Sequence, residues 1–169
     1  MSNSLFFRHL LWLFIFYFLE VTVSARLGSF APPLVLCVVV GIALECGPAH
    51  GIVWGILAGI LFEPFASGAI GGASLAFALA GWLTGMISSK MFNESFWVRM
   101  IWPCAALIVS ATAETLWSRP AEMDYPFWAA LSSALPFQKI LSTLLVAPWV
   151  VSFAKVHRTS NRRFRAVYS

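Results

Sequence analysis

The chain has 169 residues, of which 60% are hydrophobic and only 11% are charged. Soluble domains carry about 25% charged residues, so this chain has too little charge to solvate the surface of a globule. A soluble enzyme domain, a disordered chain and a collagen-like repeat are excluded, and the mean hydropathy of +0.82 indicates a polytopic membrane protein. The three cysteines lie in apolar stretches and predict no disulfide framework.

Six apolar stretches stand out along the chain. Each is predicted to be a helix, because a backbone in lipid must satisfy its polar groups internally. The predicted fold class is therefore all-α, with six transmembrane helices in a domain over residues 1–154 and a basic tail over residues 155–169. The spans are expected at about residues 6–23, 33–46, 48–62, 70–87, 96–116 and 136–154.

The first stretch has two interpretations. Arg8, the apolar run Leu10–Leu19 and the small residues at 23–25 are similar to a signal peptide with its cleavage site. Glu20 and the further apolar stretches favour an uncleaved first helix.

The second and third stretches are short and meet at Gly47 and Pro48. Gly suits a helix end and Pro suits a first helical turn. A continuous helix over residues 33–62 would be about 45 Å long, well beyond the hydrocarbon core. A tight helical hairpin is predicted instead, and its shortness implies either tilt or local mismatch with the bilayer.

The basic residues set the predicted orientation. With six spans, eight of the eleven Lys and Arg residues fall on one side, including the whole C-terminal tail, and three fall on the other. By the positive-inside rule both termini are cytoplasmic. In the longest outer loop, at residues 117–135, an interfacial helix or aromatic anchor is predicted from Tyr125, Phe127 and Trp128.

The sharpest pattern is a stripe of glycines at intervals of four on the third helix. Glycine lets helix backbones approach closely where lipid provides no hydrophobic drive. The stripe is interpreted either as helix packing within this chain or as a seam for a partner's helix. Its members are Gly47, Gly51, Gly55 and Gly59, and the fourth helix offers Gly81 and Gly85 in return.

Glu63 ends the third helix and is followed by Gly68, Gly71 and Gly72. A carboxylate at a membrane boundary is an interfacial acid, a cap for a neighbouring helix, or a polar contact that holds a loop or a partner. Glu20, Glu45 and Glu114 also lie near predicted helix ends and are assigned ordinary interfacial roles.

The inventory of reactive residues argues against an enzyme. Asp124 is the only aspartate, so the chain lacks the second aspartate that an aspartic intramembrane protease needs. His9, His50 and His157 lie at span ends or in the tail, away from a serine nucleophile. Metal-binding and phosphate-binding motifs are absent from the sequence, so we expect no catalysis, no metal and no cofactor.

The tail is either a topology determinant attracted to anionic lipid headgroups or a docking peptide for a cytoplasmic partner. Nucleic acid is a poor candidate, because the tail is short and has no folded platform. The residues expected at the membrane surface are Lys155, Arg158, Arg162, Arg163 and Arg165.

The stretch from Pro32 to Ser89 resembles the MreD family, small membrane proteins of the bacterial rod-shape machinery. The length, the helix count and the basic tail are also similar. That family usually has Asp where this chain has Glu63. The features that carry the resemblance are Pro32-Pro33-Leu34, the glycine stripe after Pro48, Ile60-Leu61-Phe62-Glu63, and Ala80 to Gly85 before the basic Lys90.

The resemblance implies a protein of the bacterial cytoplasmic (inner) membrane that is not an enzyme. It would act as a scaffold of the elongation complex, binding directly to MreC, a single-span protein with a large outer domain. Through the complex it would meet the MreB filament, the polymerase RodA and its partner transpeptidase. The glycine stripe and the outer loop after Glu63 are expected to help shape the surface that MreC meets.

The same six-helix layout is similar to the substrate-binding subunits of energy-coupling-factor vitamin transporters. The alternative function is therefore a subunit that binds a small molecule and needs an ATPase partner. Such a subunit should hold an outward cavity with several convergent polar groups.

Overall fold

The computed structural model describes residues 3–65, 71–88, 96–117, 128, 131–132 and 135–167. Over these residues the protein is built of helices, which confirms the predicted all-α fold class. The long helices are α1 (Asn3–Leu27), α2 (Leu34–Cys46), α3 (Pro48–Phe62), α4 (Gly72–Ser88), α5 (Phe96–Trp117) and α7 (Phe137–Val167). Two short 3-10 helices, η1 (Gly28–Phe30) and η2 (Glu63–Phe65), follow α1 and α3.

The helices differ in apolar length. Phe6–Leu27 in α1 and Met100–Trp117 in α5 are long and apolar enough to cross a membrane, whereas the apolar parts of the other four are shorter. A layout of six spans therefore stays a prediction.

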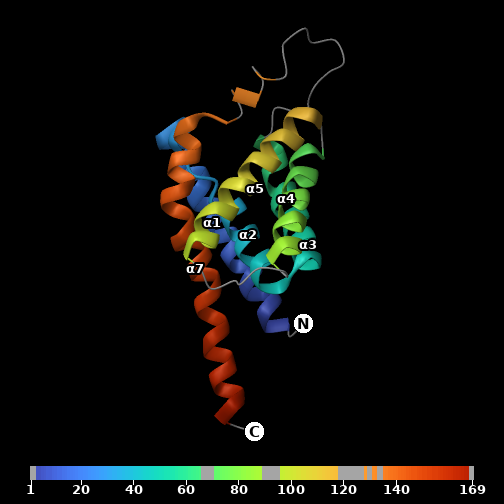
Figure 1. Cartoon of the computed structure of the whole chain (residues 1–169), viewed down its shortest axis with the longest axis vertical. Helices are drawn as coiled ribbons and strands as arrows, with labels where there is room; N and C mark the ends of the chain where they lie inside the picture. The colour runs from blue at the N-terminus through green and yellow to red at the C-terminus, as the bar shows by residue number, and fades with distance from the viewer. Residues whose placement is uncertain are drawn as a thin grey trace.

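Helix α2 forms the centre of the bundle and contacts α1, α3, α4, α5 and α7 (Figure 1). Every residue from Leu34 to Leu44 is buried. The sequence explains this position, because a helix that is apolar all round has no face for water and is covered by neighbours. The core around it combines aliphatic side chains of α2 with Trp54 of α3 and Leu13 of α1.

The chain passes directly from α2 to α3 at Gly47. Gly47 has φ of 90°, a backbone conformation that side chains rarely allow, and Pro48 opens the next helix. The hairpin predicted from Gly47 and Pro48 is therefore built with a single residue between the two helices.

Both chain ends lie at the same end of the bundle, which we call the terminal end (Figure 1). Helix α7 continues beyond residue 154, the predicted end of the last span, to Val167 and projects past the other helices. Of the predicted aromatic anchor, Trp128 is helical and exposed, while Tyr125 and Phe127 lie outside the described residues.

Candidate functional site

The glycine stripe lies at the contact between α3 and α4. A Cβ atom added to Gly55 would lie 2.5 Å from the Phe77 carbonyl oxygen and 2.7 Å from Ala78 Cα. At Gly59 the added atom would collide with the backbone of Ser74, and at Gly51 with the Gly81 carbonyl oxygen. The two helices therefore touch backbone to backbone along their length.

Helix α4 contributes its own glycines to this contact. A Cβ atom on Gly81 would meet the Gly51 carbonyl oxygen, and one on Gly85 would lie 2.5 Å from Pro48 Cα. Gly51, Gly55 and Gly59 are buried. Packing within the chain thus accounts for these three positions, which face α4 and not the surface that a partner's helix would meet.

The remaining glycines of the prediction have other positions. Gly47 and Gly71 have positive φ and nothing within 4 Å of an added Cβ, so the backbone turn is what requires glycine there. Gly72 is buried, and its added Cβ would lie 2.7 Å from Cδ1 of Trp117 on α5. Gly68 lies outside the described residues.

Glu63 makes a polar contact within the chain. The Ser74 hydroxyl donates a hydrogen bond of 2.7 Å to Oε1 of Glu63. Ser74 lies in the first turn of α4, where a negative charge is favoured by the helix dipole. Glu63 therefore ties the end of α3 to the start of α4, at the end of the bundle opposite the chain termini.

Glu20 has a structural role that sequence reasoning did not find. Its Oε2 accepts a hydrogen bond of 2.8 Å from the backbone N–H of Val35, in the first turn of α2. The N-cap of α2 is Pro33, which supplies no side-chain cap, so α1 provides the acceptor instead. The sequence does hold a signal for this contact. Helix α2 begins directly after Pro-Pro, with no Ser, Thr, Asp or Asn to cap its first turn, so an acceptor from another helix is needed.

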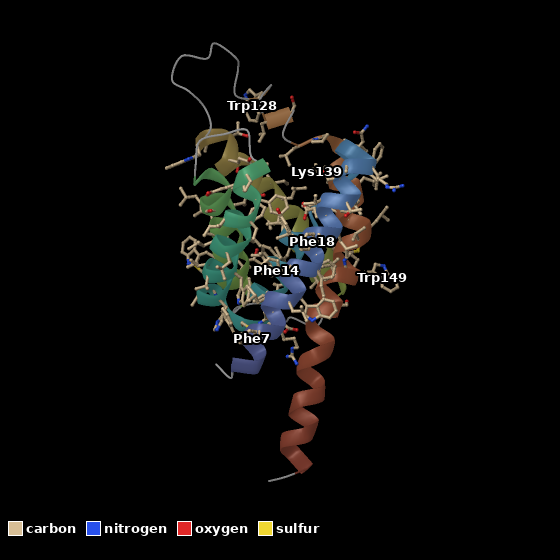
Figure 2. The ribbon with its side chains drawn as sticks, turned by 180° about the vertical axis from the view of Figure 1, so that it is seen from behind. Phe7, Phe14, Phe18, Trp128, Lys139 and Trp149 are labelled. Atoms are coloured by element: carbon tan, nitrogen blue, oxygen red, sulfur yellow. The ribbon has the colours of Figure 1, made fainter. Side chains whose placement is uncertain are left out.

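Lys139, in the first turn of α7, interacts electrostatically with Glu20. The carboxylate thus joins α1 to α2 through its hydrogen bond, and the positive charge at the start of α7 lies near enough to act on it. Figure 2 shows Lys139 at the end of the bundle opposite the chain termini.

Polar groups at the terminal end are also held by local contacts. His50 Nδ1 lies 3.0 Å from the Cys46 carbonyl oxygen across the α2–α3 turn. The His9 ring packs edge-on against Trp54, with centroids 5.6 Å apart. The described part of the chain contains no group of three His, Cys, Asp or Glu residues that could hold a metal ion.

Helix α1 presents an uncovered apolar face. Phe7, Leu11, Phe14 and Phe18 recur at helical spacing and are all exposed, and Figure 2 shows Phe7, Phe14 and Phe18 along one side of the helix. We call these four residues the α1 face. The sequence could not distinguish this side, because α1 is apolar in nearly every direction.

The five basic residues assigned to the membrane surface all lie in the projecting part of α7. Lys155 is nearest to the bundle and Arg165 is ten positions further on, a distance of about 15 Å along a helix axis.

The family model described as rod shape-determining protein MreD matches residues 2–156 of the chain. No curated protein and no solved structure gives a match.

The glycine contact predicts a strong dependence on side-chain size. Gly55→Leu forces α3 and α4 apart, and overpacking of this kind typically costs about 1–3 kcal/mol or more. We expect a lower midpoint of thermal unfolding in detergent for Gly55→Leu. The matched control is Ala49→Leu, which adds a similar side chain at an exposed position of the same helix and should leave the midpoint nearly unchanged. Equal midpoints for both variants would contradict backbone contact at Gly55.

The Glu20 contact predicts a difference between two substitutions. Glu20→Ala leaves the Val35 N–H without its acceptor, at a cost of about 1–3 kcal/mol. Glu20→Gln keeps an oxygen that accepts this bond and should retain most of the stability. Thermal unfolding of the two variants in the same detergent tests the difference. Equal destabilisation would show that charge, and not hydrogen-bond acceptance, is what Glu20 supplies.

Proposed function

Because the chain belongs to the MreD family of rod shape-determining membrane proteins, we propose that it is a scaffold of the bacterial cell-elongation complex. In this proposal it binds MreC within the cytoplasmic membrane. Through the complex it helps to position RodA, its partner transpeptidase and the MreB filament for lateral peptidoglycan synthesis. The observation that carries the proposal is the family match over residues 2–156.

We propose further that the protein carries out no catalysis of its own. Several polar side chains at or near the core are already used in structural contacts. Thr84 and Ser110, both buried, donate to the Ala80 and Leu107 carbonyl oxygens of their own helices. The carboxylates of Glu20 and Glu63 accept the bonds that join α1 to α2 and α3 to α4.

A vitamin-binding subunit has less support. Such a protein needs a cavity lined by convergent polar groups. Here α2 lies at the centre, and its side chains from Leu34 to Leu44 are apolar and buried against the surrounding helices.

The α1 face is the surface that we assign to MreC. Gly51, Gly55 and Gly59 of the glycine stripe pack against the α4 backbone and leave no room there for another helix. Helix α1 packs chiefly on α2, so its opposite side is uncovered. Its 25 residues extend about 37 Å, enough to match the full length of an ordinary single span. Aromatic side chains also supply large contact areas at interfaces.

Site-specific photocrosslinking tests this assignment. A photoreactive phenylalanine analogue at Phe18 should form a covalent adduct with MreC when both proteins are expressed in native membranes. The same analogue at Ile60, an exposed apolar position of α3, serves as the control and should give no MreC adduct.

Two results would contradict the assignment to the α1 face. An MreC adduct at Ile60 but not at Phe18 would move the interface to α3. Absence of an MreC adduct at Phe7, Leu11, Phe14 and Phe18 alike, with normal protein levels, would remove the α1 face from the proposal.

The orientation with both termini in the cytoplasm is also part of the proposal. The two chain ends lie at one end of the bundle, as an even number of passes requires (Figure 1). The basic residues of α7 follow the positive-inside rule in this orientation.

The basic residues of α7 fall into two groups that differ in their distance from the membrane. Charges more than a Debye length of about 8 Å from the headgroups are largely screened at physiological ionic strength. Because α7 projects from the bundle along its own axis, Lys155 and Arg158 lie nearest to the headgroups, and Arg162, Arg163 and Arg165 lie further out. We propose that Lys155 and Arg158 contribute most of the attraction to anionic lipid.

Paired substitutions test this division. Lys155→Gln with Arg158→Gln should weaken binding of phosphatidylglycerol about thirtyfold, since each basic residue near the surface contributes about 1 kcal/mol. Arg162→Gln with Arg163→Gln removes the same charge and should change binding less than about twofold. Phosphatidylglycerol titrated into neutral-lipid nanodiscs and followed by native mass spectrometry measures both. Equal losses would show that the distal arginines also reach the membrane.

A further inference from the structure

Helices α3 and α4 form a hairpin that is short for a bilayer. Helix α3 has 15 residues and α4 has 17, which correspond to about 22 Å and 26 Å along their axes. The hydrocarbon core of a typical bilayer is about 30 Å thick. Helix α1, with 25 residues, and α5, with 22, reach about 37 Å and 33 Å. The hairpin is therefore shorter than α1 and α5. Helix α2, with 13 residues, is shorter still, but it lies at the centre of the bundle and is covered by its neighbours.

Polar side chains mark the limits of the short side. At the terminal end, Glu45 and His50 flank the Gly47 turn between α2 and α3. At the opposite end, Glu63 is bonded to Ser74. From His50 to Glu63 the helix advances 13 positions, about 20 Å.

Tilt does not resolve this mismatch. A helix tilted from the membrane normal spans less thickness than its own length, so tilting α3 or α4 increases the deficit. A short hydrophobic segment is accommodated instead by thinning of the bilayer, by snorkelling of flanking side chains or by association with other helices. The sequence left tilt or mismatch open for the α2–α3 hairpin, and α3, which belongs to both hairpins, is too short for tilt to match it to the bilayer.

The outer side of the hairpin is apolar and exposed. On α3 it consists of Val53, Ile56 and Ile60, and on α4 of Leu75, Leu79, Trp82 and Met86. Together these seven residues are called the hairpin face.

The hairpin face presents no small residues through which another helix could approach its backbone. Helices associate in membranes through small residues that let backbones approach. The hairpin has such residues, but Gly51, Gly55, Gly59, Gly81 and Gly85 all face inward, toward the partner helix of the hairpin. The hairpin face carries branched, aromatic and thioether side chains instead. The α1 face is also made of large apolar side chains, so helix length, and not composition, is what distinguishes the two faces.

We propose that the hairpin face binds phospholipid acyl chains in a locally thinned bilayer, so that this side of the protein prefers shorter lipids than the α1 side. The protein then imposes two thicknesses on the surrounding membrane. This goes beyond the scaffold function and depends only on the protein's lying in a membrane, not on its binding MreC.

Lipid competition at two positions tests the proposal with the purified full chain. Leu79→Cys on α4 and Phe14→Cys on α1 form a matched pair, because the native side chains at these positions are 43% and 40% exposed. Each is labelled with bimane in a background of Cys46→Ala and Cys104→Ala, with the buried Cys37 left in place. Brominated phosphatidylcholine quenches the label, and phosphatidylcholines with fourteen-carbon or eighteen-carbon chains compete for the site.

At Leu79 the fourteen-carbon lipid should displace the brominated lipid about two- to threefold better than the eighteen-carbon lipid, whereas at Phe14 that preference should be absent or reversed. The same chain-length preference at both positions would overturn the proposal. Weak quenching at Leu79 beside strong quenching at Phe14 would also overturn it, because a second copy of the chain would then cover the hairpin face.

A second pair protects the test against a variant that fails to fold. Ile60→Cys on α3 and Leu11→Cys on α1 report on the same two sides, with native exposures of 53% and 60%. The thermal unfolding midpoint of each labelled protein is compared with that of the parent, and the pair that keeps the parent value decides the outcome.

Discussion

Close approach of two helix backbones at the α3–α4 contact is the interaction on which the arrangement depends. Lipid tails are as apolar as leucine side chains, so burying apolar surface gives little drive for helices to associate in a membrane. Glycines at Gly51, Gly55 and Gly59 remove the side chains that would hold α3 away from α4. Direct packing of the two backbones then supplies van der Waals contact along the whole hairpin. The polar bond between Glu63 and Ser74 closes the contact at one end.

The central position of α2 follows from this contact. Helix α2 is joined to α3 by one residue, Gly47, so its direction and depth are set by the hairpin. It is apolar all round and has no side-chain cap at its first turn, so it needs neighbours on every side and an acceptor from elsewhere. Glu20 of α1 supplies that acceptor, and this fixes the depth at which α1 lies against α2. The hydrogen bond from Val35 to Glu20 thus sets the register of α1 against α2, while glycine and aliphatic packing set the distances between helices.

The sequence predicts the parts of this structure that depend on local pattern. Composition gives the helical class, Gly47-Pro48 gives the helix break, and the four-residue glycine spacing gives a ridge for close packing. Gly81 and Gly85 indicated the fourth helix as a neighbour, but spacing alone left open whether the ridge packs within the chain or against a partner's helix. The same limit hides the Glu20 contact, since its partner Val35 lies 15 residues away across a turn. The uncovered side of α1 also depends on tertiary neighbours that periodicity does not show.

The two uncovered faces differ in length, and that difference separates the surfaces on which lipid and a protein partner would act. A partner span of ordinary length matches the α1 face but would extend beyond the ends of the hairpin face, leaving apolar residues against polar headgroups. Hydrophobic matching therefore disfavours the hairpin face for such a partner even before side-chain complementarity is considered. In the function that we propose, membrane thickness as well as contact orients the partner. The glycines that draw α3 and α4 together affect both faces. They are buried in the α3–α4 contact, so the hairpin offers no small-residue surface to a partner, and α1 is left as the full-length face available for binding.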